Sequence, residues 1–284
     1  MSVVVNTNMT SVMVQRNLSN ATSSIQTNMK RLSTGMRING AADDAAGLSL
    51  SEKLNSHVKS SDIAKSNAQT GINMLQIADS DLSVIQENLQ KMRNLAIQAA
   101  NGVYSSSERK AIDQEVQERL DEINRISASS QFSDLKLLDG SLADTTTNPD
   151  GLRLQVGTYT PLTANTIDIS LAFVTTTTSA LGLAGMNVTT VANARLAVDA
   201  LDVAIEDMSE RRSKIGASIN RLTSTIQRID VRQENLASSY SVIRDTDIAK
   251  ETADLTKNQV LQQASGVLLR QANQSTQIAL SLLQ

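Results

Sequence analysis

The longest regular pattern of apolar positions runs through residues 191–243. Apolar side chains recur there at alternating steps of three and four residues, and only Arg212 and Gln233 interrupt the series. A repeat of this period, sustained without an internal proline, predicts a long helix with a coiled-coil-like seam. Two explanations are open for Arg212 and Gln233: exposure at a gap in the bundle, which is the simpler one, or fixing of the register between helices.

A second apolar seam lies upstream and ends at Asn101-Gly102, a typical helix terminator. The capping-box sequence from Ser105 to Glu108 then opens a third apolar-periodic segment. We therefore predict helices over 48–100, 105–129 and 189–243.

The predicted helix lengths set the shape. A helix of about 53 residues is roughly 80 Å long, whereas a compact globule of this chain length would be only about 50 Å across. Between the helices, 152–156 and 166–173 alternate with period two, which predicts a β-hairpin within 150–175. The expected fold is mainly α: an elongated rod of long antiparallel coiled-coil-like helices with a small β-hairpin.

Both ends of the chain carry narrower apolar stripes, within 5–38 and 248–284, surrounded by Asn, Gln, Ser and Thr. Neither stripe is expected to fold reliably alone, so both segments should be disordered in a lone subunit and helical against neighbouring copies. The alternative is that they pair within one chain as an intramolecular hairpin. The residues expected at a subunit interface are Val14, Leu18, Ile25, Met29, Leu32, Leu261, Leu268, Ile278 and Leu282.

The amino-acid composition excludes several classes of function. The 284-residue chain has 26 Lys+Arg against 29 Asp+Glu, and its net charge of −3 gives no general attraction to nucleic acid or acidic membranes. Cysteine is absent, which excludes disulfides, thiol nucleophiles and thiolate metal sites. No apolar run is long enough to span a bilayer, and the start lacks the basic region of a cleavable signal peptide.

The residues that could carry chemistry do not form a site. The single histidine, His57, has no metal-ligating neighbours at helical spacing, which indicates a solvated helix surface. Asp43 and Asp44 are adjacent and would point about 100° apart on a helix, so they are not an acid–base or metal pair. With Gly35 and further glycines nearby, we interpret this segment as a hinge in which one aspartate caps the following helix. We predict no catalytic residue, cofactor or metal ion.

The chain resembles bacterial flagellin in several long segments. The N-terminal part of that family is similar to "LSTGMRINGAADDAAGLSLSEKL", "LQKMRNLAIQAANG" and "IDQEVQERLDEINRIS". The C-terminal part is similar to "ALDVAIEDMSERRSKIGASINRL" and "IRDTDIAKETADLTKNQVLQQASGVLLRQAN". The likeness covers 1–141 and 180–284, without the large outer domains that many flagellins carry between these parts, and so resembles a minimal flagellin.

This resemblance implies a structural subunit, not an enzyme, that polymerises into the extracellular flagellar filament used for swimming. The alternative is a hook–filament junction protein. Residues 1–44 and 245–284 would form the inner-tube domain, with Gly35, Asp43 and Asp44 in the connecting spoke, and 45–244 would form the rod domain. The implied partners are further copies of the chain, an export chaperone and the type III export apparatus, and the filament cap and hook-junction proteins.

The resemblance also implies contact with a Toll-like receptor of a host. The family pattern L-Q-R-x-R-E-L reads "LQKMRNL" here, so Lys91 replaces an arginine and Asn94 a glutamate. Lysine lacks the planar bidentate bonding of arginine, which weakens the expected recognition. The implied contact residues are Gln90, Lys91, Arg93, Leu95 and Glu115.

Overall fold

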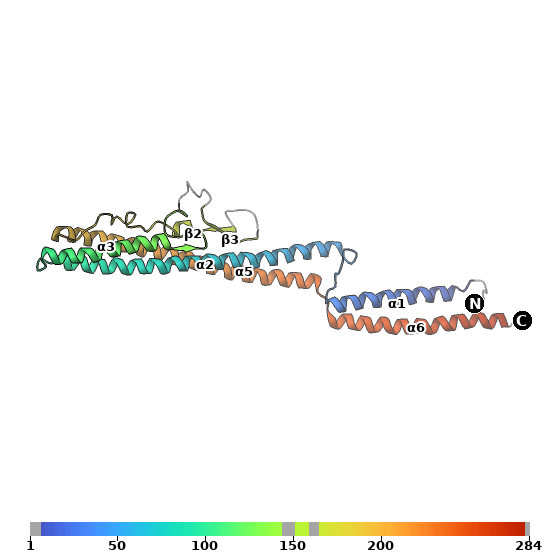
Figure 1. Cartoon of the computed structure of the whole chain (residues 1–284). Helices are drawn as coiled ribbons and strands as arrows, with labels where there is room; N and C mark the ends of the chain where they lie inside the picture. Colours follow the sequence, from blue (N-terminus) through green and yellow to red (C-terminus); the bar gives the residue numbers. More distant parts are fainter. Residues whose placement is uncertain (1–6, 144–150, 159–164, 282–284) are drawn as a thin grey trace. The chain divides into compact units, whose positions relative to one another are not determined.

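The computed structural model describes residues 7–143, 151–158 and 165–281, most of which are helical (Figure 1). The helices in chain order are α1 (Met9–Thr34), α2 (Ala45–Ala99), α3 (Ser106–Ser129), α5 (Val191–Arg244) and α6 (Ile248–Ser281). The short elements are β1 (Gln131–Phe132), β2 (Leu135–Lys136), β3 (Arg153–Gln155), β4 (Thr166–Asp168) and the 3₁₀ helix η1 (Ser170–Ala172). The predicted mainly α fold with long helices and a small β-hairpin is confirmed.

The chain divides into two compact units. One contains the residues up to Val58 and those from Glu234 onward, and the other is Lys59–Gln233. Helices α2 and α5 each run through both units. The sequence predicted domain boundaries at 44/45 and 244/245. These boundaries divide the chain by the role of each part in a polymer, so they stay a prediction.

Helices α2 and α5 run antiparallel within the Lys59–Gln233 unit. Ion pairs join Lys65 to Asp230 at 2.7 Å and Arg93 to Asp202 at 2.5 Å, so the position on α5 falls as the position on α2 rises. Between these pairs the predicted seams meet in an apolar core. Its fully buried members include Leu75, Leu82, Leu89, Leu201, Met208, Ile215 and Leu222.

The two polar interruptions of the α5 seam are contacts to α2. The Arg212 guanidinium donates to Asp79 at 2.9 Å and to Gln86 at 3.0 Å. Gln233 Nε2 donates to Asp62 Oδ1 at 2.7 Å. These cross-helix bonds favour the register explanation over simple exposure at a gap, because each long side chain lies at the seam edge and reaches a polar group on the facing helix.

Helix α3 packs its buried face, Val116, Leu120 and Ile123, into the same core. Ser105 and Glu108 form the predicted capping box, with Ser105 N donating to Glu108 Oε2 at 2.7 Å. A two-residue antiparallel ladder, β1–β2, follows α3, and the sequence pattern predicted no strand there.

The predicted hairpin is present as β3–β4, in which Leu154 pairs with Ile167. Its second strand is shorter than the alternating pattern suggested. Asp168 Oδ1 accepts hydrogen bonds from the backbone N and Oγ of Ser170, and this turn leads the chain from β4 into η1. The hairpin packs on α2 at Gly71, where an added Cβ would lie 2.1 Å from Leu154 Cδ1.

The terminal helices α1 and α6 pair antiparallel within the other unit (Figure 1). Asn8 Nδ2 donates to the Ala272 carbonyl at 2.9 Å, and Arg31 forms an ion pair with Glu251 at 3.8 Å. Over the described residues the structure therefore shows the alternative arrangement, in which α1 and α6 pair within one chain. The physical reason is that α1 packs against small and polar side chains of α6.

Candidate functional site

The hinge segment is held by its two adjacent aspartates in different ways. Asp44 Oδ1 accepts from Gly47 N at 2.9 Å, so Asp44 caps the first turn of α2 as the sequence suggested for one of the pair. Asp43 Oδ2 accepts from the backbone N of Asn39 and of Gly40, both at 3.0 Å. The hydrogen bond from Asn39 is the main cause of a lowered pKa at Asp43. Both carboxylates hold backbone groups and do not converge on a shared ligand.

The connections at the hinge are joined through main-chain atoms. Gly35 ends α1 with a left-handed φ of 68°. Its carbonyl accepts from Thr246 N at 3.0 Å, and Arg37 N donates to the Arg244 carbonyl at 2.7 Å. A β-bridge between Met36 and Asp245 lies between these bonds.

The apolar residues predicted at an interface on α1 are only partly buried against α6. Val14 is buried, together with Ala21 and Asn28 at successive steps of seven residues. Met29, expected at an interface, is 59% exposed. The remaining predicted residues, Leu18, Ile25 and Leu32, are half-buried.

Helix α6 presents its polar and small residues to α1, and its predicted apolar stripe faces away. The buried positions are Glu251, Ser265 and Ala272. Leu261 and Leu268 are 47% and 55% exposed in the paired structure. The side chain of Ile278 and the whole of Leu282 lie outside the described residues.

The exposed stripe contains residues that were not predicted. Val260 and Val267 adjoin the two leucines in sequence, and all four are exposed. Spacings of one and seven residues put them on one side of a helix. The same periodicity could have identified the two valines, because both pairs repeat at seven. We call Val260, Leu261, Val267 and Leu268 the α6 stripe.

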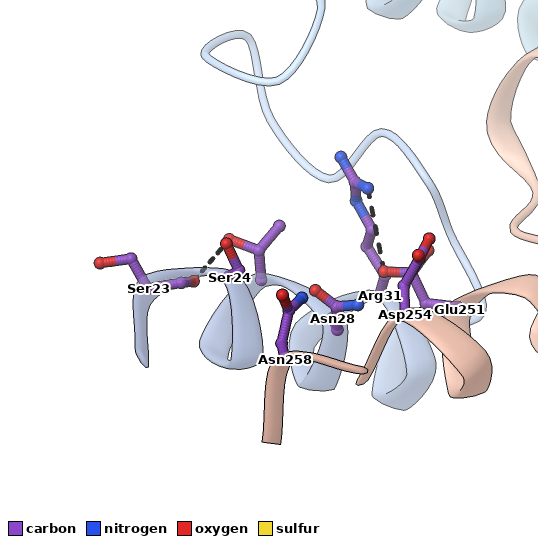
Figure 2. A pocket seen from close by; sticks show the side chains of 8 residues that line it. Ser23, Ser24, Asn28, Arg31, Glu251, Asp254 and Asn258 are labelled. Carbon is purple, nitrogen blue, oxygen red and sulfur yellow. Dashed lines mark hydrogen bonds and ion pairs between the residues drawn. The ribbon is translucent and has the colours of Figure 1, made fainter. Parts of the chain in front are cut away.

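A shallow polar groove of about 320 Å³ lies between α1 and α6 (Figure 2). Arg31 and Glu251 pair across it, and Asn28 and Asn258 line it (Figure 2). Glu251 is only 7% exposed. A half-buried arginine therefore balances a buried carboxylate in this seam, which restricts how α1 and α6 can slide.

The residues implied in receptor contact come from α2 and α3. Gln90 and Lys91 are exposed, and Lys91 forms an ion pair with Glu87 at 2.6 Å. Arg93 is engaged by Asp202, and Leu95 packs partly against the core. Glu115 on α3 pairs with Arg119 at 2.7 Å, and Arg119 also donates to Asn88 of α2 at 3.2 Å, so these positions lie on neighbouring turns of two contacting helices.

Other site types find no support among the described residues. No group of three or more His, Asp or Glu side chains in this part of the chain could hold a metal ion. Of the helices in the same residues, none combines the length and the apolar character needed to cross a membrane.

Comparisons with known proteins agree over the whole length. The family described as "Bacterial flagellin N-terminal helical region" matches residues 5–143, and "Bacterial flagellin C-terminal helical region" matches 198–283. The chain is 39% identical over 291 residues to the flagellar filament 33 kDa core protein of Treponema phagedenis, covering 99% of this chain and 100% of that protein. It is 38% identical over 281 residues to a flagellin of Halalkalibacterium halodurans, with 99% and 100% covered.

A solved structure shows the same fold at low identity. It is the structure of a putative flagellar hook-associated protein from Vibrio parahaemolyticus, with a TM-score of 0.56, 16% identity, and coverage of 71% of this chain and 99% of that one. The likeness in sequence to the two flagellar relatives is far closer and spans nearly every residue. The chain therefore belongs to the bacterial flagellin family, and is a structural subunit, not an enzyme, that polymerises into the extracellular flagellar filament.

Proposed function

We propose that the α6 stripe and the exposed apolar residues of α1 are the surface through which copies of this chain contact one another in the inner part of the filament. The observation that carries this proposal is the exposure of Leu261 and Leu268 in a helix already paired with α1. A repeating apolar face left open in one chain is typical of an interaction surface. The corresponding α1 residues are Met9, Val12, Met13 and Met29.

The geometry of such a contact supports an open polymer. The α6 stripe and the exposed α1 residues differ in sequence, so one copy can offer the first surface to the second surface of the next. A contact of this head-to-tail kind that does not close into a ring builds a helical filament. We assign 1–44 and 245–284 to an inner tube, 45–244 to the surrounding rod layer, and Gly35, Asp43 and Asp44 to the spoke between them.

Polymerisation of substituted chains tests the surface. Replacing Leu261 and Leu268 by glutamine retains a good helix former and removes apolar area worth on the order of 1 kcal/mol at each position. The critical concentration for assembly should rise roughly tenfold or more. Gln259→Ala, at an exposed α6 position off the stripe, is the matched control and should assemble like the unchanged chain.

Electron microscopy and sedimentation give the readout. Unchanged assembly by Leu261→Gln/Leu268→Gln would remove the α6 stripe from the interface. The unchanged chain should form long filaments, whereas a hook–filament junction protein would form only short zones.

We extend the proposal to partners that handle the chain before and around assembly. The α6 stripe would have to be covered before copies meet, which supports an export chaperone that holds α6 while the chain passes to the type III export apparatus. At filament ends the same stripe lacks its next copy, which supports contacts with the cap and hook-junction proteins. A chaperone competing for the α6 stripe should lose affinity in Leu261→Gln/Leu268→Gln and retain it in Gln259→Ala, as measured by calorimetry.

We also propose weak recognition by a host Toll-like receptor through Gln90, Lys91, Arg93, Leu95 and Glu115. Lys91 is a lysine where the family pattern has arginine, and Glu87 already pairs with it. Lys91→Arg with Asn94→Glu should therefore raise activation of receptor-expressing reporter cells. Equal activation by the unchanged and substituted chains would contradict this assignment.

A further inference from the structure

A second cavity, of about 520 Å³, lies between the β3–β4 hairpin and α5, entirely within the Lys59–Gln233 unit. Val156 and Ile167 of the hairpin segment supply a buried apolar wall. The side formed by α5 carries Arg221, Ser224 and Arg228. The cavity thus combines an apolar wall with two exposed, positively charged side chains.

The two arginines are placed to act together. They are seven residues apart on a continuous helix, which puts them on the same face with Cα atoms about 10 Å apart along the axis. Ser224 lies between them, one turn from each. Guanidinium groups remain charged at any working pH, and their planar forks match the oxygens of carboxylate, phosphate and sulfate groups.

Neither guanidinium is neutralised by a close acid in the described part of the chain, where no ion pair within 4.0 Å involves Arg221 or Arg228. This contrasts with Lys65, Arg93 and Arg212, each of which has an acidic partner across α2 and α5.

Asp168 of the hairpin is the acidic residue whose charge interacts with Arg221, and its hydrogen bonds go to another residue. It accepts two hydrogen bonds from Ser170 and lies 4.0 Å from Arg153. Burial opposes its ionisation, but the Ser170 hydrogen bonds and the charges of Arg153 and Arg221 together lower its pKa, so it is ionised at neutral pH. The charged residues that line the cavity are therefore both positive, and Asp168 is the acidic group whose charge interacts with Arg221.

We propose that this cavity binds an oxyanion, a carboxylate, phosphate or sulfate group, between the guanidinium groups of Arg221 and Arg228, with the Ser224 hydroxyl as a neutral donor. Two sources fit the same chemistry. One is a free anion in solution, and the other is a carboxylate of a second copy of the chain, which rests on the proposed packing of copies. The first source can be tested without polymerisation, so its result is independent of the proposed function.

The first experiment uses the dilute, full-length chain, kept monomeric as checked by sedimentation, with ¹⁵N-labelled arginine side chains. Inorganic phosphate is titrated at constant ionic strength, with chloride as the reference anion. The Nε–H signals of Arg221 and Arg228 should shift saturably. Arg228→Gln should weaken binding by about tenfold or more, because one charge-assisted hydrogen-bonding partner is lost.

Arg195→Gln is the matched control, because Arg195 is an exposed arginine on the same helix outside the cavity. It should leave phosphate binding unchanged. Shifts that stay linear with phosphate, that chloride reproduces, or that Arg228→Gln leaves intact would overturn the proposal and make the cavity an ordinary solvated basic face.

The second experiment identifies the source in the polymer by equilibrium dialysis of sedimented filaments against radiolabelled phosphate. Binding that persists and is lost in Arg228→Gln supports a free anion. Exclusion of phosphate together with a higher critical concentration for Arg228→Gln supports a carboxylate of a second copy. Exclusion of phosphate with an unchanged critical concentration would overturn any role of the cavity in the filament.

Discussion

Arg212 on α5 and Asp79 on α2 are joined by two hydrogen bonds, from Nε at 2.9 Å and from Nη2 at 3.4 Å. The carboxylate raises the pKa of Arg212, and the guanidinium also reaches Gln86. Both side chains of the pair remain about one-third exposed, so solvent screens their interaction. The pair therefore contributes more to register than to stability.

A double-mutant cycle measures this pair. Arg212→Gln and Asp79→Asn should each lower the free energy of unfolding by about 0.5–1 kcal/mol, and the double variant should lose less than the sum. Urea unfolding followed by circular dichroism gives the values. Strict additivity would show that the two side chains do not interact in solution.

The contact between Gly71 and Leu154 predicts a site where alanine lacks its usual benefit inside a helix. Alanine normally stabilises a helix by about 0.5–1 kcal/mol relative to glycine. An added Cβ at Gly71 would overlap Leu154 Cδ1, so the leucine side chain must turn away, and Gly71→Ala should fall short of the usual gain by about 0.5–1 kcal/mol.

Gly216 provides the matched comparison on α5, because nothing lies within 4 Å of an added Cβ there. Gly216→Ala should be stabilising by thermal unfolding. In a Leu154→Ala background, where the overlap is absent, Gly71→Ala should give the usual gain of a helical alanine. Equal stabilisation by Gly71→Ala and Gly216→Ala would contradict the observed packing of the hairpin on α2.

Protonation of Asp43 should loosen the hinge. Its pKa is lowered in the folded chain, first by the hydrogen bond from Asn39 N. The stabilisation is therefore present above the ordinary aspartate pKa of about 4 and is lost as pH falls through the lower folded value. The protection of the Asn39 and Gly40 amides, which is their hydrogen-exchange rate relative to the intrinsic rate at the same pH, should fall over that acidic range in the unchanged chain. In Asp43→Asn the protection of these two amides should not change over the same pH range. A change that persisted in the variant would mean that another group titrates.

Asp44 should matter for the first turn of α2. Asp44→Ala removes the acceptor for Gly47 N and should cost about 1 kcal/mol of local helix stability. Asp44→Asn keeps a capping oxygen and should cost much less. Hydrogen exchange at Gly47 and Leu48 reports the difference, and equal protection in the two variants would show that the cap is dispensable.

The long helices could be predicted because their apolar seams repeat over many turns without a proline. Residues such as Leu82 of α2 and Leu201 of α5 are then buried in one core, as the period requires. The two-residue strands β1 and β2 could not be predicted, because so short a segment has no period to detect. Arg212 was ambiguous for a related reason: its polar character was visible, but its partner Asp79 lies far away in sequence.

The orientation of α6 was the main feature that sequence reasoning could not supply. The helix carries a leucine and valine stripe and a separate seam that includes Glu251, Ser265 and Ala272. Apolar periodicity placed Leu261 and Leu268 at a contact with another copy of the chain, which stays a prediction, and did not identify the seam that packs on α1. In the structure small and polar side chains pack against α1, helped by the Arg31–Glu251 ion pair. Periodicity locates a seam but does not say whether its partner is in the same chain.

The backbone bridge between Met36 and Asp245 has a mechanical consequence. The main-chain hydrogen bonds on either side of it connect the segment that follows α1 to the segment that precedes α6. Tension applied to one terminal helix passes to the connection of the other through peptide groups, whatever side chains surround them. In the filament, this main-chain connection would let both terminal helices of each chain share a mechanical load.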